Sequence, residues 1–292
     1  MIKLAAINIY PVKSLQGIRV ESAELTETGL RWDRFWMVVN EDGFFATQRQ
    51  LPAMAKIKTQ ITDEHLILSH PEMHDLLIPL EFQGGKTREA RVWKSECLVV
   101  DEGQEAQTWL TAALGEWREQ KLSLVRMAES FSRAVSNNHT DGAQNTTYFA
   151  DGYPLLLISE ASLSKLNERS PSAVSMRQFR PNIVVKGSGG FEEDTWKRIR
   201  IGEVEFEVVK PCSRCVFTTV NPETGEKDKK LEPLKTLKTF RQGESGDVYF
   251  GQNLVALNEG KVSLDDKVEV LAYQTPEFYP DTQKSMQDKT QS

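Results

Sequence analysis

Short apolar segments, separated at regular intervals by turn residues, constrain the fold of this chain more than any other feature of its sequence. Residues 3–10 alternate between two faces, as a short strand does. Gly17, the Asp-Gly step at 42–43 and Pro71 mark turns between the segments that follow. Strands at intervals of roughly 8–12 residues are typical of a barrel or a sandwich rather than of βαβ units. The further strands expected in this half cover residues 18–25, 35–39, 44–47, 57–61 and 66–68.

The second half of the chain begins after a polar stretch at residues 128–147, which is rich in Ser, Asn and Thr and is the expected loop and domain boundary. A buried strand is expected at 154–158, and Ser159 follows it as a candidate N-cap of a helix. Two other helices are expected, at 104–114 with Gly115 as its stop and at 234–240. The remaining expected strands cover residues 183–185, 198–201, 204–210, 254–257 and 268–271.

These patterns together predict a mostly β fold with a few helices, in the α+β class. We expect a β-barrel-like N-terminal domain at residues 1–120 and a second β domain at 121–272. Residues 273–292 are polar and carry two prolines, so they are expected to form a tail or a linker.

Charge and composition exclude several classes of function. The chain carries 42 acidic and 36 basic residues, a net charge of −6, and has no block of Lys and Arg, so it is not expected to bind nucleic acid. Its apolar runs are too short to cross a bilayer, and no membrane association is expected. An odd count of three cysteines without a secretory signal indicates reduced thiols and a cytoplasmic protein.

Two of these cysteines, Cys212 and Cys215, form a C-x-x-C motif whose sequence context leaves more than one interpretation open. A structural zinc site needs four ligands, and neither Cys97 nor the four histidines supply a matching pair. The motif lies between two expected strands, 204–210 and 216–220, which predicts a tight β-turn rather than the start of a helix. The cysteines are then either two small residues packed in a turn, or they include a thiolate held for a metal centre, which Arg214 would favour.

Cationic residues stand at the ends of three expected strands. Lys13 and Ser14 end the first strand, Arg34 begins another, and Arg180 and Asn182 flank Pro181 before a buried one. Each cation alone indicates a surface ion pair. Together they supply guanidinium, ammonium, hydroxyl and amide groups, which can bind a phosphate and a hydrogen-bonding heterocycle such as a pterin or purine.

Seven blocks of residues resemble, in order, the MOSC family with its N-terminal β-barrel partner domain. The likeness is greatest to the bacterial YcbX type, which is related to the mitochondrial amidoxime reducing component. It implies an N-terminal MOSC β-barrel domain followed by a MOSC β-barrel domain. The blocks are Tyr10–Ser14, Asp33–Trp36, Phe149–Pro154, Phe179–Val185, Pro211–Val220, Pro233–Leu237 and Phe250–Asn253.

The resemblance implies a molybdenum-dependent oxidoreductase that removes oxygen from N-hydroxylated compounds, such as hydroxylamine-type base analogues and amidoximes. It implies the molybdenum cofactor (molybdenum on molybdopterin), with Cys215 as the catalytic thiolate ligand of the metal. For the MOSC domain taken alone, the resemblance also implies pyridoxal phosphate binding. The cofactor-binding residues that it implies are Lys13, Ser14, Arg34, Asp151, Gly152, Arg180, Asn182, Ser213, Arg214 and Asn253.

The chain departs from the YcbX type in one respect: it has no cysteine after Cys215, whereas a C-terminal two-iron ferredoxin domain needs four. We therefore expect no iron–sulfur cluster in this chain and an external electron-donor protein, either a reductase or ferredoxin-like. Two other readings stay open. The chain could be a carrier or sulfur-handling module that only holds the cofactor, or a thiol redox protein that uses Cys212 and Cys215 alone.

Overall fold

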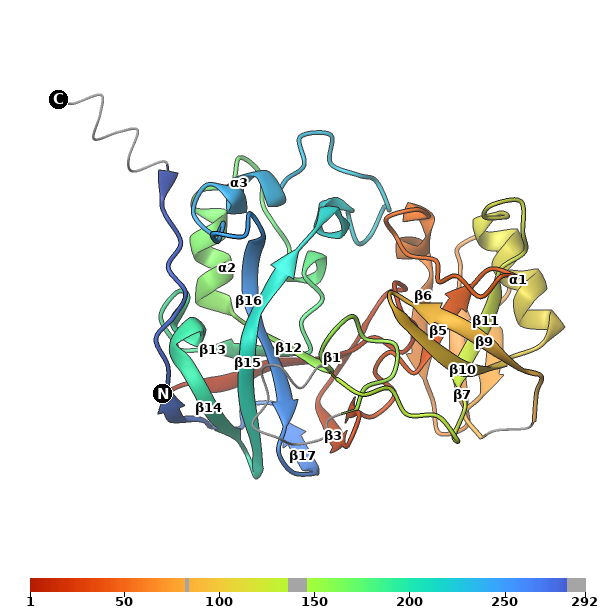
Figure 1. Cartoon of the computed structure of the whole chain (residues 1–292), viewed down its shortest axis with the longest axis horizontal. Helices are drawn as coiled ribbons and strands as arrows, with labels where there is room; N and C mark the ends of the chain where they lie inside the picture. The colour runs from red at the N-terminus through yellow and green to blue at the C-terminus, as the bar shows by residue number, and fades with distance from the viewer. Residues whose placement is uncertain (82–83, 136–145, 283–292) are drawn as a thin grey trace.

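The computed structural model describes residues 1–81, 84–135 and 146–282, and it has two lobes that lie side by side (Figure 1). Strands dominate both lobes, so the predicted mostly β fold with a few helices is confirmed. The expected loop at 128–147 and the expected tail at 273–292 fall partly outside the described residues.

The large lobe is built on one sheet of eight strands, in the order β18-β14-β15-β16-β12-β13-β1-β2. Only β12 and β13 run parallel within it; the other neighbours are antiparallel. Alternate apolar residues of these strands, such as Ile7 and Ile9 of β1 and Ile183 and Val185 of β13, form the core of this lobe. The strands are β1 (Lys3–Ile9), β2 (Ile18–Val20), β12 (Leu155–Ser159), β13 (Ile183–Lys186), β14 (Trp196–Ile201), β15 (Val204–Arg214), β16 (Val248–Ala256) and β18 (Val268–Tyr273).

Shorter elements complete the large lobe. Ser159 caps α2 as predicted, since its side chain accepts a hydrogen bond from the Ser162 backbone N–H at 3.0 Å. The elements are a small sheet of β3 (Ser22–Thr26), β4 (Gly29–Leu30) and β17 (Gly260–Ser263), the helices α2 (Glu160–Asn167) and α3 (Leu234–Lys238), and the 3₁₀ turns η3 (Met176–Gln178), η4 (Glu192–Thr195) and η5 (Val216–Thr219).

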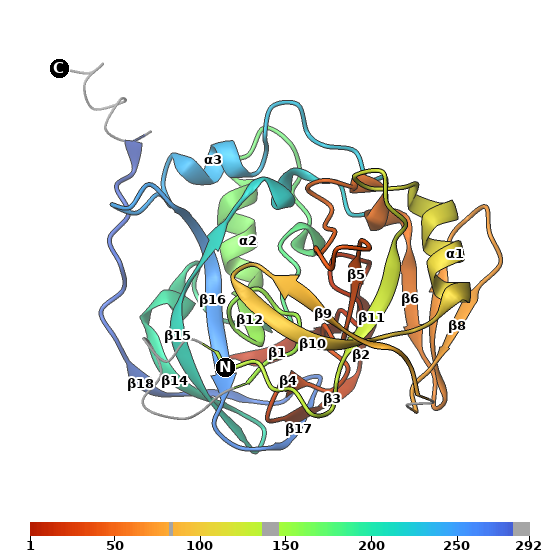
Figure 2. The ribbon, with the colours of Figure 1, turned by 45° about the vertical axis from the view of Figure 1, so that its right-hand side comes forward.

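The small lobe holds two sheets, β5-β11-β10-β9 and β6-β7-β8, with one helix packed against them (Figure 2). The helix α1 (Gln104–Leu114) buries Ala106, Trp109 and Leu110 and ends at Gly115, as its apolar stripe predicts. The other elements are β5 (Trp36–Val39), η1 (Pro52–Lys56), β6 (Lys58–Ile61), β7 (His65–Ser69), β8 (Leu76–Pro79), β9 (Thr87–Val92), β10 (Ser95–Asp101) and β11 (Ser123–Met127).

Strand pairing crosses between the N-terminal and C-terminal halves of the chain. The first strands, β1 and β2, join the large sheet beside β13, while β11 pairs with β5 in the small lobe. The domain limits at residue 120 stay a prediction: β1 and β2 lie before this residue yet join the large sheet, and β11 lies after it yet pairs with β5 in the small lobe.

The environment predicted for the cysteine motif is wrong. The strand β15 does not stop at Lys210 but runs through the motif to Arg214, still paired with β16. Shifts of register on either side of Pro211 let the strand continue past a residue that cannot donate a hydrogen bond. The expected strand at 216–220 is instead the turn η5, which begins directly after Cys215.

Other expectations also differ from the structure. Residues 44–47 make only isolated bridges, and the expected strand at 18–25 divides into β2 and β3. The start of the polar tail is structured: Asp281 pairs with Arg169 at 2.8 Å, and the Thr282 N–H donates to the Thr239 carbonyl. Among the described residues, no helix is long and apolar enough to cross a membrane.

Candidate functional site

The backbone is strained at residues that the sequence singled out. Ser14, Arg34 and Arg180 adopt the left-handed conformation, with φ of 68°, 50° and 56°. This region is uncommon for residues other than glycine and is concentrated at functional sites. Four of the ten described non-glycine residues with positive φ line one pocket, the fourth being Trp93.

That pocket lies between the two lobes and has a volume of about 360 Å³. Its lining includes Lys13, Arg34 and Trp93 from the first part of the chain and the end of β15 from the second. Every residue that the sequence predicted for the site lines it: Lys13, Ser14, Arg34, Asp151, Gly152, Arg180, Asn182, Ser213, Arg214, Cys215 and Asn253.

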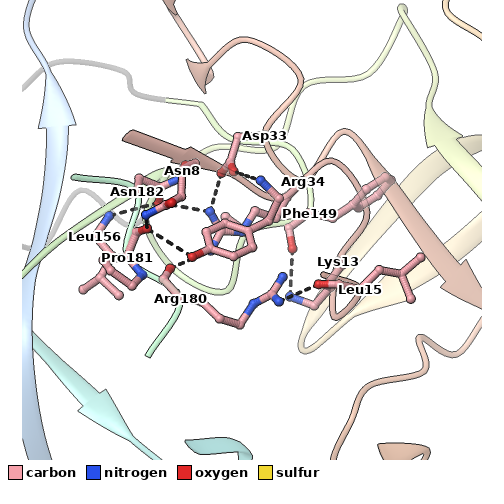
Figure 3. Close-up of polar contacts among 12 residues, drawn as sticks. Asn8, Lys13, Leu15, Asp33, Arg34, Phe149, Leu156, Arg180, Pro181 and Asn182 are labelled. Atoms are coloured by element: carbon pink, nitrogen blue, oxygen red, sulfur yellow. Dashed lines mark hydrogen bonds and ion pairs between the residues drawn. The ribbon is translucent and has the colours of Figure 1, made fainter. Parts of the chain in front are cut away.

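A buried network orients Arg34 (Figure 3). Its guanidinium donates to the Asp33 carboxylate at 2.6 Å and to the Asn182 amide oxygen at 3.0 Å. The Asn182 amide nitrogen donates to the Asn8 carbonyl at 3.1 Å, so this side chain is committed to protein partners rather than presented to a ligand. Burial raises the pKa of Asp33, and the Arg34 guanidinium opposes that rise.

Two arginines in the pocket wall keep donors without partners. Arg180 packs on the Tyr10 ring at 4.1 Å and donates from Nη1 to the Leu15 carbonyl (Figure 3), and Arg214 donates to the Phe250 and Phe179 carbonyls. Within the described parts of the chain, the Nη2 atom of each is buried and has no hydrogen-bond partner. Burial, with the nearby Arg34 charge, lowers the pKa of Arg180 to about 10. Unpaired buried donors of this kind fit an anionic, oxygen-rich ligand.

Lys13 and Asp151 form an ion pair at the pocket wall. The Lys13 ammonium donates to the Phe149 carbonyl at 2.8 Å and to the Asp151 carboxylate at 2.5 Å (the first of these is drawn in Figure 3). Although the Asp151 side chain is 70% exposed, the Lys13 charge beside it holds the pKa of that carboxyl well below its ordinary value. Burial lowers the pKa of Lys13, against the effect of Asp151.

The two thiols of the motif lie in different environments. Cys215 is exposed at the end of β15, and its sulfur lies 3.8 Å from Nη1 of Arg49. Cys212 is half-buried, and burial raises the pKa of its thiol. No group of three or more His, Cys, Asp or Glu side chains in the described part of the chain could hold a metal ion, so the motif has no protein partners for a zinc site.

Several lining residues were missed by sequence reasoning. Arg49 and Trp93 belong to short turns with no motif around them, and Lys210 looked like an ordinary strand end. With these included, six Lys or Arg side chains and one carboxylate, Asp151, line the pocket. A concave site with this imbalance attracts anions, although the chain as a whole is acidic. The other missed residues with polar side chains include Thr47, Tyr153, Gln178 and Thr218.

Comparison with known proteins agrees with the motifs. The MOSC N-terminal beta barrel domain matches residues 1–117, and the MOSC domain matches residues 144–269. The mitochondrial amidoxime reducing component 2 of Bos taurus is 40% identical over 240 residues, which cover 80% of this chain and 70% of that protein. The mitochondrial amidoxime-reducing component 1 is 37% identical in Mus musculus and 36% in Homo sapiens, and each alignment covers 92% of this chain and 82% of the relative.

Proposed function

This chain belongs to the MOSC family, among relatives that include the mitochondrial amidoxime-reducing components, and we propose that it reduces N-hydroxylated compounds with a molybdenum cofactor bound between its lobes. One observation carries the proposal: the exposed Cys215 thiol and a set of cations, two with unpaired buried donors, line the same pocket. Amidoximes and hydroxylamine-type base analogues are the proposed substrates. An external protein is the proposed electron donor, and a cytoplasmic location stays a prediction.

The side chains present suit such a cofactor. Arg180, Arg214 and Lys13 would hold its phosphate and pterin, because guanidinium forks and an ammonium bind phosphate oxygens well. The Cys215 thiolate is a soft ligand suited to a sulfur-rich molybdenum centre. When bound, the cofactor supplies the two-electron chemistry that converts an N–OH group and two protons to N–H and water. Asp151, Gly152, Ser213 and Asn253 are proposed to complete its binding, with Ser14 and Arg34.

The protein itself would position and shield the reacting groups. Asp33 and Asn182 keep Arg34 in one orientation. The guanidinium of Arg49 lies 3.8 Å from the Cys215 sulfur, so its positive charge would stabilise negative charge on a substrate oxygen bound there. Substrate would enter from the side on which Cys215 is exposed.

Metal analysis together with a reduction assay tests the proposal. The purified chain should contain molybdenum and reduce an N-hydroxylated compound when a reduced viologen dye supplies electrons. Cys215→Ser should abolish this activity, whereas Cys212→Ser should retain much of it, because the half-buried thiol only adjusts its neighbour.

Other outcomes favour the other readings. Molybdenum content without reduction in the wild type would indicate a carrier or sulfur-handling module. Equal loss of the reduction activity in both cysteine variants, in a chain that contains no molybdenum, would indicate dithiol chemistry. Equal retention of this activity in both variants would contradict the assignment of Cys215 as the metal ligand.

A further inference from the structure

A second pocket shares part of its wall with the pocket between the lobes. Its volume is about 420 Å³, within the usual range of small-molecule sites. Gln178, Arg180 and Phe217 line both pockets, and Asn8 and Pro181, drawn beside Arg180 in Figure 3, also line the second one. The proposed function gives this second pocket no role.

Small residues leave room for the second pocket. Ala5 and Ala6 line it from β1, where strands more often carry β-branched or aromatic side chains. The register of β1 against β13 shifts between Leu4 and Ala6, and such an irregularity re-aims side chains, so that both alanines border the same pocket. Gly17 lines it as well, and a Cβ at that position would lie 2.4 Å from the Tyr10 ring.

Apolar side chains from several elements form much of the remaining wall, so an apolar ligand would leave water on entering it. Methionine adapts its shape to an irregular ligand, and one methionine is among these residues. They are Leu163 of α2, Met176 of η3, Val184 of β13, Phe217 of η5, Val220 and Pro222.

The segments that carry this wall are fixed without a ligand. The turn η3 begins with a capping box formed by Ser175 and Gln178. The Gln178 amide nitrogen also donates to the Thr218 carbonyl at 3.0 Å, which ties η3 to η5. A preformed wall loses little conformational entropy when a ligand binds.

Charge gives the second pocket a preference for anions. Among the described residues, three guanidinium groups, those of Arg19, Arg177 and Arg180, line it together with one carboxylate, that of Glu160. Arg177 also pairs with Glu223 at 3.1 Å. The two glutamates offset two of the three positive charges, so a ligand with a single negative charge matches the pocket better than a doubly charged phosphate.

Two of these arginines are exposed and lie at the mouth of the second pocket. Arg177 donates from Nη2 to the Gln16 amide oxygen at 3.3 Å, and Arg19 donates to the Ala5 carbonyl at 2.9 Å. These contacts hold both guanidinium groups beside the opening. A guanidinium binds a carboxylate through two parallel N–H groups, which makes this head group a good match.

We propose that the second pocket binds a small monocarboxylate with an apolar body, its carboxylate on Arg19 and Arg177 and its body against Met176 and Phe217. The inference uses neither Cys215 nor the cofactor, so it goes beyond the proposed function and does not depend on it.

Titration of the full chain with octanoate, followed by NMR of ¹³C-methyl methionine, tests both the affinity and the place of binding. The Met176 signal, assigned by its loss in Met176→Leu, should shift to saturation. The signal of Met54, which is fully buried in the core of the small lobe, should not shift. An unchanged Met176 signal would overturn the proposal.

Two related ligands test the two halves of the chemistry. Hexanoate should bind about tenfold more weakly than octanoate, because it lacks two methylene groups. Octanamide keeps the chain but not the charge, so it should bind at least about tenfold more weakly. Equal affinity of octanoate for either comparison ligand would contradict the proposal, since the apolar wall or the arginines would then contribute nothing.

An exposed arginine elsewhere gives a matched control for the head group. Arg177→Gln should raise the dissociation constant for octanoate about tenfold, the loss of one charge-assisted contact. Arg91 is equally exposed and pairs with Glu96 at 2.8 Å, so Arg91→Gln should bind like the wild type. Equal affinities of the two variants would refute the role of Arg177.

Two further variants separate the second pocket from the pocket between the lobes. Arg49→Gln removes a cation that lines only the latter, so it should bind octanoate like the wild type. If it weakens binding as much as Arg177→Gln, octanoate occupies the pocket between the lobes and the proposal is wrong. Ala6→Leu, with its fold checked by circular dichroism, should weaken binding at least about tenfold by filling the second pocket, and unchanged binding in the folded variant would contradict the proposal. If Ala6→Leu does not fold, Arg177→Gln decides.

Discussion

The buried ion pair between Asp33 and Arg34 should be far more important for stability than an exposed pair of the same length. Asp33 Oδ2 lies 2.6 Å from Arg34 Nη1, and the two side chains are only 3% and 14% exposed. Asp33 also accepts the Tyr10 backbone N–H at 2.8 Å. Asp33→Ala would therefore leave a guanidinium buried without its carboxylate and a backbone donor without its acceptor.

The expected loss of unfolding free energy is about 3–5 kcal/mol, the range for removing one partner of a buried pair. The chain offers a matched control in Glu24 and Arg31, which lie 2.7 Å apart with side chains 57% and 58% exposed. Glu24→Ala should cost about 0–1 kcal/mol, because water screens the exposed pair. Asp33→Asn keeps an acceptor for the Tyr10 N–H but not the charge, so its loss of unfolding free energy should lie between those of Asp33→Ala and Glu24→Ala.

Urea unfolding of the three variants and the wild type measures these differences, followed in parallel by circular dichroism and tryptophan fluorescence. If the two signals give the same transition, unfolding is two-state and the free energies of unfolding can be compared. If Asp33→Ala proves no more destabilising than Glu24→Ala, burial does not govern the strength of this pair and the reasoning is refuted.

Three further predictions concern the cofactor, the electron route and pH. Arg180→Ala and Lys13→Ala should each lower the retention of molybdenum and pterin about ten- to a hundredfold, because each charge-assisted contact contributes roughly 1.5–3 kcal/mol. Turnover per bound metal should change less. Full metal content with lost turnover would instead place these residues at the substrate. The purified chain should reduce N-hydroxylated compounds with a viologen dye but not with NADPH alone, because no G-x-G-x-x-G fingerprint follows a strand, and NADPH-driven turnover would contradict this. Burial raises the pKa of Glu193, so the folded state retains that proton more strongly. Below about pH 4.3, the ordinary pKa of Glu, the free energies of unfolding of the wild type and of Glu193→Gln should depend on pH in the same way. Above that pH, the wild type should lose stability relative to Glu193→Gln as the pH rises toward the raised pKa. Parallel curves of stability against pH would refute the assignment.

Local features were predicted well because they depend on neighbouring residues. The cap at Ser159 and the buried stripe of α1 each involve side chains within a few positions, and both are confirmed. The motif blocks also indicated the family, which the two domain matches confirm. The roles of the individual site residues stay predictions, although the structure brings all eleven of them to one pocket.

Features that depend on distant segments could not be read from the sequence. The strand expected at 204–210 ends before the cysteines, yet pairing with β16 extends β15 to Arg214. Asn182 looked like a ligand donor, but its amide is committed to Asn8, 174 positions earlier.

By itself, the sequence determined the β-rich class of this protein, its family and the residue types available for chemistry, because alternation, caps and motifs are local properties of the chain. Only the tertiary structure decided that Arg49 lies beside Cys215, 166 positions away, and stacks on Trp93. Such contacts arise when sheets from both halves of the chain pack together, and the free energy of that packing depends on the whole core rather than on any short stretch of residues.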